Sequence, residues 1–392
     1  IALSPGLRVI PFAVVSIGAA ILAGRRSTKA QLDEVRGVSE SAAPTEEAEE
    51  PISQTLAIDE IKIELGYGLL PLINDLEGRR LTDQIKALRK TLASEYGFVM
   101  PPVRILDNMR LASQSYLIRI KELEAGDGEV RLGSLMAMDP RGGQVELPGE
   151  HLREPAFGLP ATWIEESLRE EAAFRGYTVV DPATVLTTHL TEILKDNMPD
   201  LLSYAEVQKL LRDLPAEHKK LVDDIVPSVV SVTTIQRVLQ ALLRERVSIR
   251  DLPSILEGLS EAAPHSGSLT NLVEQVRSRL SRQLCFAHRG EDGALPIITL
   301  SPEWEGAFAE SLVGTGEDRQ LSMPPSRLQE FIRSVGDAFE RAAQAGDSPV
   351  LLTSPGVRPF VRSLIERFRG QTPVMSQNEV HPRARLKTVG VI

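Results

Sequence analysis

The chain is long and acidic, and it contains few aromatic residues. At 392 residues it exceeds the size at which one hydrophobic core keeps growing, so we expect two to four domains. The net charge of -10 argues against nucleic-acid binding, which needs a net basic face. A single cysteine, Cys285, excludes an intrachain disulfide and a cysteine metal cluster, and we expect it to be a buried or half-buried small apolar residue.

The N-terminal segment contains an uncharged apolar run, residues 9–24. It is just short of the roughly 18 to 20 residues that span a bilayer, and it becomes long enough only if residues upstream contribute. Because the chain begins at Ile1 and not at Met, we expect a longer protein whose last transmembrane helix includes residues 1–26. Basic residues within 25–29 follow the run, which argues against a signal peptide and predicts that the rest of the chain faces the cytosol. The alternative is a buried core helix.

An acidic segment without apolar periodicity follows and is typical of a linker, which we assign to residues 27–58. Within it, Ile52 is an isolated apolar residue. It is either the first residue of the next domain or a side chain that docks on a neighbouring molecule.

Residues 58–200 have the pattern of an α/β region. Alternation over 58–65 predicts a half-buried strand, and apolar residues spaced by three and four from Leu81 predict an amphipathic helix that ends at Gly97. We expect further strands at 101–108 and 116–123, and turns with short strands at 126–149.

Two helices are predicted after this region of turns. The first begins near Pro160 and ends at Gly176; the second follows a short strand and opens after Asp181 with Pro182 at its first position.

The second half of the chain divides into a helical region and an α/β region. Helical periodicity broken by Pro215, Pro227 and a turn at 264–267 predicts an all-helical region between about 201 and 281. From about 294 onward, strands alternate with helices at a spacing that predicts a small α/β domain with crossover connections.

The stretch REPAFGLPATW, residues 153–163, contains one aromatic residue between two prolines. Pro155 and Pro160 restrict the backbone on either side of Phe157, and Gly158 permits a sharp turn. A helix or a central strand could hardly bury Phe157 there. The residue is either a partly exposed anchor for a partner or a core residue between two subdomains.

No strong catalytic signature occurs in the sequence. Phosphate-loop, zinc-protease and nucleophile-elbow motifs are all missing. His189 has Glu192 three residues further on, but a metal site needs more ligands, so we expect an ordinary satisfied or exposed histidine. The glutamates within 165–171 fit the solvated face of a helix. We therefore predict no enzyme activity, no catalytic or metal-binding residue and no cofactor.

Several long stretches together resemble one family, the FHIPEP family of type III export-gate proteins, and in particular the cytoplasmic half of its flagellar members. The match covers nearly the whole chain from Gly66 onward. The stretches are GYGLLPLI (66–73), PPVRILDN (101–108), LPGEHLREPAFGLPATWI (147–164), DPATVLTTHLTEI (181–193), LVDDIVPSVVSVTTIQRVLQALLRERVSIRDLPSILEGL (221–259) and PVLLTSPGVRPFVRSLIER (349–367).

The resemblance implies an α/β multidomain fold with four subdomains after the membrane helix and linker. The first is a thioredoxin-like α/β unit, interrupted by a small α/β insertion as the second, and followed by a helical third and an α/β fourth. The expected boundaries are 1–26 for the partial membrane helix, 27–58 for the linker, 59–132 and 182–201 for the first subdomain, 133–181 for the second, 202–281 for the third, 282–380 for the fourth and 381–392 for a C-terminal tail.

The resemblance also implies a function in protein export. Family members form a ring, usually of nine subunits, at the inner membrane below the export channel. The ring receives flagellar export chaperones with bound substrates and passes the substrates to the membrane gate, alongside an ATPase complex. Neither nucleic acid nor a cofactor is implied. The alternatives are a homologous virulence injectisome export-gate protein and a mainly structural ring-assembly module.

Individual positions carry roles in the family. Chaperone docking in relatives uses an acidic residue, a phenylalanine and a threonine, which correspond to Glu154, Phe157 and Thr188 here; relatives more often have Asp at the first position. The linker position that docks on a neighbouring subunit falls on Ile52, where relatives often have Trp. Separately, Arg358 and Arg362 are four residues apart on one predicted helix, and they form either a ring interface with acidic partners on a neighbouring subunit or a solvated helix face.

Overall fold

A computed structural model describes residues 58–74, 80–140, 142–266, 268–314 and 319–392. The predicted membrane helix (1–26), the predicted linker (27–58) except for Ile58, and with it Ile52 lie outside the described residues. Within the described part of the chain, no helix is long and apolar enough to cross a bilayer.

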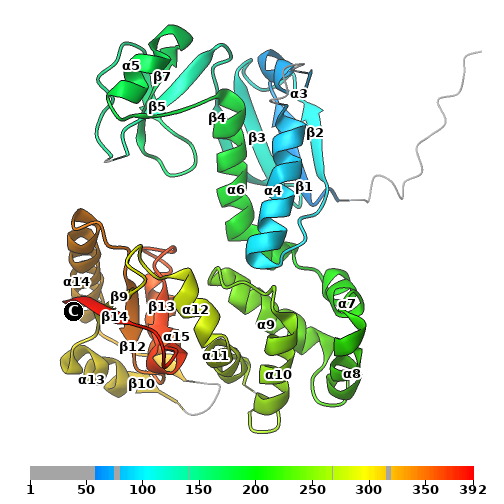
Figure 1. Ribbon diagram of the computed structural model, residues 1–392, viewed down its shortest axis with the longest axis vertical. Coiled ribbons are helices and arrows are strands. Elements are labelled where there is room, and N and C mark those ends of the chain that lie inside the picture. The colour runs from blue at the N-terminus through cyan, green and yellow to red at the C-terminus, as the bar shows by residue number, and fades with distance from the viewer. Residues whose placement is uncertain (1–57, 75–79, 141, 267, 315–318) are drawn as a thin grey trace, which may run out of the picture. The chain divides into compact units, whose positions relative to one another are not determined.

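The first subdomain is built on a mixed sheet with the strand order β2-β1-β3-β4, covered by two helices that lie side by side, α4 and α6 (Figure 1). The central strand β1 runs parallel to β2 and antiparallel to β3. Its alternate residues Ile61, Ile63 and Leu65 are fully buried, which confirms the predicted half-buried strand. The elements are β1 (Ile61–Leu65), η1 (Tyr67–Leu69), α3 (Pro71–Asn74), α4 (Leu81–Tyr96), β2 (Val103–Asp107), β3 (Ser115–Ile120), β4 (Leu123–Glu129) and α6 (Pro182–Leu201).

The ends of the two helices follow the signals in the sequence. Helix α4 ends at Gly97, whose left-handed φ of 70° suits glycine. Helix α6 begins after Asp181, whose carboxylate accepts a hydrogen bond from the Thr184 N–H at 2.8 Å, with Pro182 at the first helical position. Both predicted boundaries are confirmed.

An inserted second sheet, with the order β6-β7-β5-β8, lies between β4 and α6 in the chain. It packs on both faces, because Leu135 and Ile164 enter a small core of their own while Met136 and Trp163 join the core of the first subdomain. The elements are β5 (Ser134–Met138), β6 (Glu150–Arg153), β7 (Pro160–Glu165), η2 (Glu166–Leu168), α5 (Arg169–Phe174) and β8 (Thr178–Val180).

The prediction of a helix from Pro160 onward is wrong for its first part. Residues 160–165 form the strand β7, which pairs antiparallel with β5 and β6. Successive side chains of this strand enter different cores, so the apolar residues follow the two-residue period of a strand and not the period of a helix. Thr162, Trp163 and Ile164 also have a high propensity for β-strands. The α-helix begins only at Arg169.

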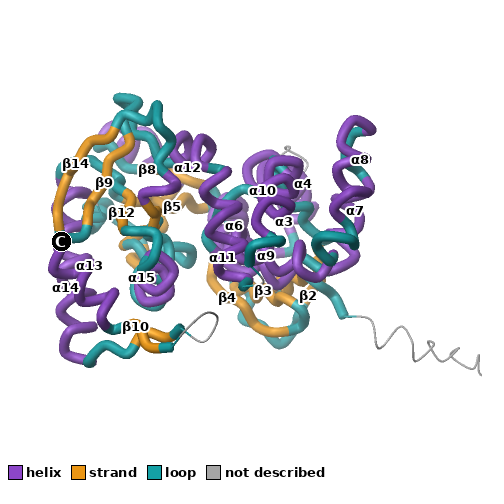
Figure 2. Tube along the Cα trace, turned by 90° about the horizontal axis from the view of Figure 1, so that it is seen from below, coloured by secondary structure: helices purple, strands orange, loops and turns teal. Residues whose placement is uncertain are grey.

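The next region is helical throughout, as predicted. Figure 2 shows α7 to α11 as helices joined by loops, and between 202 and 281 the described residues include no strand. Ser203, Ser231 and Asp251 cap their helices through side-chain oxygens. The helices are α7 (Tyr204–Arg212), α8 (Ala216–Ile225), α9 (Val232–Arg244), α10 (Leu252–Ala262), α11 (Leu269–Arg279) and then α12 (Ser281–Ala287).

The fourth subdomain contains a parallel sheet with the order β13-β12-β9-β14. The four residues of β12 are all buried, because apolar cores lie on both faces of the sheet. The elements are β9 (Leu295–Thr299), α13 (Pro302–Glu310), β10 (Leu312–Val313), β11 (Gln320–Leu321), α14 (Pro325–Gln344), β12 (Val350–Thr353), α15 (Arg358–Ile365), β13 (Val374–Ser376), η4 (Gln377–Glu379) and β14 (Leu386–Val391).

The assignment of 381–392 to a tail needs correction. Strand β14, Leu386–Val391, lies within that range and pairs in parallel with β9, so it belongs to the sheet of the fourth subdomain. The basic residues Arg383, Arg385 and Lys387 obscure the strand in the sequence, because they interrupt the apolar pattern at its start.

Candidate partner-docking site

Phe157 lies on a tight loop between β6 and β7, and 55% of its surface is exposed. The loop closes through two backbone hydrogen bonds: Glu154 N–H donates to the Leu159 carbonyl at 2.9 Å, and Gly158 N–H donates to the Glu154 carbonyl at 3.0 Å. Gly158 has a φ of 69°, which only glycine adopts at little cost. The interpretation of Phe157 as a core residue therefore does not fit this exposure.

The Glu154 carboxylate holds the backbone of this loop. It accepts hydrogen bonds from the N–H groups of Ala156 at 2.7 Å, Phe157 at 2.5 Å and Leu159 at 3.3 Å. Glu154 is only 5% exposed. The family resemblance implies that Glu154 is a docking residue, but here its carboxylate faces into the loop and fixes the backbone that carries the Phe157 ring.

Thr188 comes from a different element, helix α6 of the first subdomain, and is half-buried. The next residue, His189, is buried, and its Nδ1 lies 2.8 Å from the Tyr116 hydroxyl on β3. Burial lowers the pKa of His189, although the charges of Glu154 and Asp127 act in the opposite direction. The charge of Glu154 therefore acts on the pKa of His189, the residue that follows Thr188 on α6. Among the described residues, no hydrogen bond joins Thr188 to Phe157.

Two glycines on β4 leave room for the Tyr116 and His189 pair: Gly126 faces His189 of α6, and Gly128 faces Tyr116 of the neighbouring strand β3. A Cβ at Gly126 would lie 2.9 Å from His189 Nε2, and one at Gly128 would lie 2.6 Å from the Tyr116 hydroxyl. The buried Tyr116 and His189 pair is therefore a structural support of α6, as expected for an ordinary histidine. Among the described residues, no group of three His, Cys, Asp or Glu side chains could hold a metal ion.

Arg358 and Arg362 are buried inside the chain, at 2% and 7% exposure, and this corrects the expectation of an exposed pair on α15. Arg358 donates to both oxygens of Glu245 at 2.7 and 3.1 Å and also binds Glu274. Arg362 donates to the carbonyls of Gly370 and Thr372 at 3.0 and 2.9 Å. Because their partners belong to the same chain, neither arginine is available on the surface for a neighbouring subunit.

These two arginines belong to a largely buried ionic network between α11 and the fourth subdomain. Arg277 on α11 binds Glu379 of η4 at 2.6 Å and lies 3.1 Å from Glu245. Burial by itself raises the pKa of Glu245, but Arg277 and Arg358, with Arg362, outweigh it and lower the pKa to about 2. Burial raises the pKa of Glu274 despite its contact with Arg358. The network is Glu245, Glu274, Arg277, Arg358, Arg362 and Glu379.

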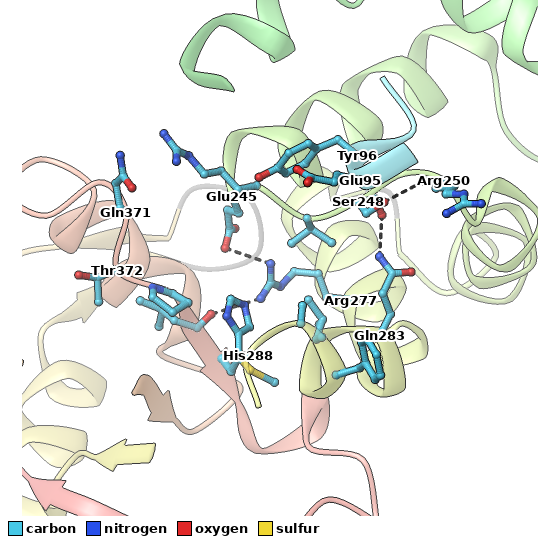
Figure 3. Close-up of a pocket in the computed structure, with 18 of the residues that line it drawn as sticks. Glu95, Tyr96, Glu245, Ser248, Arg250, Arg277, Gln283, His288, Gln371 and Thr372 are labelled. Atoms are coloured by element: carbon cyan, nitrogen blue, oxygen red, sulfur yellow. Dashed lines mark hydrogen bonds and ion pairs between the residues drawn. The ribbon is translucent and has the colours of Figure 1, made fainter. Parts of the chain in front are cut away.

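A cavity of about 890 Å³ lies beside this network (Figure 3). Arg277 points toward Glu245 across it, and His288 lies next to Arg277. Another wall comes from the end of α4, where the Tyr96 carbonyl accepts a hydrogen bond from Ile249 N–H at 2.8 Å. The cavity therefore borders the first, third and fourth subdomains.

No pattern in the sequence indicates this network, because its members are far apart in the chain. Glu245 and Arg358 are 113 residues apart, and Arg277 and Glu379 are 102 apart. The only local signal is the spacing of Arg358 and Arg362, which indicates a shared helix face but not burial. Cys285 is buried as expected, with its Sγ accepting a hydrogen bond from the His381 N–H at 3.3 Å.

The fold is similar to that of a class of solved structures that includes the EscV cytosolic domain from the type III secretion system. The structure of the Chlamydia pneumoniae CdsV protein matches with a TM-score of 0.77 and 25% identity, covering 86% of this chain and 98% of CdsV. A nonameric SctV-C structure from EPEC matches in fold with a TM-score of 0.70 and 20% identity, covering 86% of this chain and 99% of that one.

The chain belongs to the FHIPEP family, whose sequence profile matches residues 1–385. The flagellar biosynthesis protein FlhA of Caulobacter vibrioides is 74% identical over 394 residues, covering 100% of this chain and 56% of that protein. FlhA of Bacillus subtilis is 36% identical over 381 residues, covering 97% and 56%. The chain thus spans about half the length of these curated relatives.

Proposed function

We propose that this chain is part of the export gate of the flagellar type III protein export apparatus. Its function is to dock flagellar export chaperones with their bound substrates and to pass the substrates to the membrane channel. The support is the family membership, the flagellar relatives and the exposed Phe157 loop. The 74% identity to a flagellar protein favours this function over that of a virulence injectisome gate.

The single observation that carries the proposal is the form of the Phe157 loop. An exposed phenylalanine on a preorganised loop loses little conformational entropy when a partner covers it. Burial of one aromatic ring at an interface centre contributes roughly 2 kcal/mol or more. Thr188 on α6 is proposed as the contact from the first subdomain, and Glu154 as the residue that positions the ring.

We also propose that the chain works as a homo-oligomeric ring attached to the inner membrane, with its soluble subdomains in the cytoplasm and near an ATPase complex. A related EPEC structure is nonameric, and a structure of Chlamydia pneumoniae CdsV contains a complex with CdsO. Ile52 of the linker remains the proposed contact with a neighbouring subunit. The second candidate is a mainly structural function in assembling the ring. Arg358 and Arg362 are no longer proposed as its subunit interface, because both are buried within the chain.

A pull-down from a flagellated cell lysate tests the docking function. The bait is the wild-type chain, the Phe157→Ala variant or the Phe174→Ala variant, where Phe174 is a 92% exposed phenylalanine of α5 in the same subdomain. We expect several flagellar chaperones to be lost together from Phe157→Ala and retained by Phe174→Ala. If Phe157→Ala recovers the chaperones as well as Phe174→Ala and the wild type do, the result would argue for the ring-assembly function.

A further inference from the structure

A cluster of four exposed arginines lies on helix α12, just after its end, and on the segment that leads into β14. We call it the α12–β14 basic surface and define it by Arg282, Arg289, Arg383 and Arg385 together with Phe286. These residues line a shallow cleft of about 190 Å³, and no acidic side chain lines it. Within the described part of the chain, none of the four arginines forms an ion pair.

The positive charge of this surface contrasts with the negative net charge of the chain. The chain carries a net charge of -10, and several arginines elsewhere on the surface have carboxylate partners, as Arg104 has in Asp59 at 3.1 Å. Four like charges that share one cleft without an ion-pair partner among the described residues repel one another. An anionic partner would relieve that repulsion, while the remaining acidic surface would repel the same partner elsewhere.

An exposed aromatic ring lies within the basic surface. Phe286 is 63% exposed, and the guanidinium carbon of Arg289 lies 3.9 Å from the centre of its ring. Phe286 also lines the larger cavity beside the ionic network. A partner that binds the arginines can therefore bury an apolar side chain on this ring.

The two segments of the surface are fixed to each other. Cys285 Sγ on α12 accepts a hydrogen bond from His381 N–H at 3.3 Å, which joins the two segments. Separately, Gln283 Nε2 donates to the Ser248 carbonyl at 3.0 Å and holds α12 against the loop before α10. These hydrogen bonds therefore hold in place the backbone segments that carry the arginines. Because the backbone positions are set before binding, less ordering entropy opposes the association.

We propose that the α12–β14 basic surface binds an acidic, partly apolar segment of a partner protein. The arginines come from two segments, and all four are exposed along the cleft. The cleft volume is below the range of about 300 to 1,000 Å³ that is usual for small-molecule pockets. An extended chain of carboxylates matches such a spread of charge better than a single phosphate group does.

Fluorescence anisotropy with defined peptides tests this proposal. The probe is a labelled peptide in which glutamates flank one phenylalanine and one leucine, and the comparison peptide has glutamine in place of every glutamate. We expect the purified chain to bind the acidic peptide, and the affinity to fall as salt rises. The double variant Arg383→Glu with Arg385→Glu should weaken binding by about tenfold or more, because it reverses two of the four charges.

Two further variants separate local from general effects. The double variant Arg237→Glu with Arg333→Glu changes the net charge equally at exposed arginines of α9 and α14, and it should change the affinity by no more than about twofold. Phe286→Ala should weaken binding by about tenfold through lost apolar contact, and should leave the salt dependence unchanged. Circular dichroism melting checks that every variant is folded.

Three outcomes would overturn the proposal. Equal affinity for the glutamine peptide would mean that charge does not determine binding. An equal loss in the Arg237 and Arg333 variant would mean that only the net charge acts. Displacement of the acidic peptide by ATP, with direct ATP binding lost in the Arg383 and Arg385 variant, would make the surface a phosphate site.

Discussion

Glu154 shows how one buried carboxylate can determine the shape of a binding loop. Its two oxygens accept three backbone N–H groups, including that of Phe157. The variant Glu154→Gln has one acceptor oxygen and places an amide N–H₂ against these donors. We expect it to lower the free energy of unfolding by about 1 to 3 kcal/mol. Urea unfolding at neutral pH measures this, and an unchanged midpoint would show that the carboxylate does not hold the loop.

Two histidines with lowered pKa values, His189 and His288, make the free energy of unfolding depend on pH. Burial lowers the pKa of His189, and burial together with the charge of Arg277 lowers the pKa of His288. As the pH falls below about 6.5, the unfolded chain binds protons at these imidazoles that the folded chain does not bind. The free energy of unfolding therefore falls with pH in this range. In urea unfolding between pH 7 and pH 5, we expect the free energy of unfolding of the double variant His189→Gln with His288→Gln to change less with pH than that of the wild type. Equal changes in the two proteins would show that these histidines do not cause the pH dependence.

At the scale of elements, the end of α4 is a point of close contact with the third subdomain. A Cβ at Gly97 would lie 2.5 Å from the backbone nitrogen of Arg250, and Gly97 also has a positive φ. Gly176 after α5 has a similar φ, but a Cβ added there would meet nothing within 4 Å. We expect Gly176→Ala to cost about 1 to 2 kcal/mol for the backbone alone, and Gly97→Ala about 3 kcal/mol or more. Equal losses in thermal melts would argue against the contact.

The elements also show how far local patterns determine the fold. Helices α4 and α6 are predictable with their ends, because Gly97 and the Asp181 cap act locally. Strand β7 is predicted wrongly as a helix, since the two cores that its alternate residues enter are formed by distant segments. In the candidate site, the adjacent prolines and Gly158 predict a tight loop at Phe157, but whether its ring is exposed or buried is decided only by the folded structure. The inward direction of the Glu154 carboxylate depends on loop geometry, which no local pattern specifies.

At the scale of the whole molecule, the ionic network joins the helical region to the fourth subdomain. Arg358→Met removes the arginine that pairs with the largely buried Glu274 and one of the two arginines within 3.1 Å of Glu245, and breaking a buried pair typically costs about 3 to 5 kcal/mol. We expect faster hydrogen exchange in α11 and α15, while Arg333→Met, at an exposed arginine of α14, should have little effect. If hydrogen exchange in Arg358→Met is unchanged while sedimentation shows that its oligomers are lost, Arg358 would instead contribute to a subunit interface.

The central claim is that Phe157 anchors a partner and is not part of the core. Titration calorimetry of the chain with one purified flagellar chaperone–substrate complex tests it most directly. We predict that Phe157→Ala weakens binding by about tenfold or more, at an unchanged melting temperature, while Phe174→Ala binds like the wild type. Unchanged affinity of Phe157→Ala at unchanged thermal stability would contradict the claim.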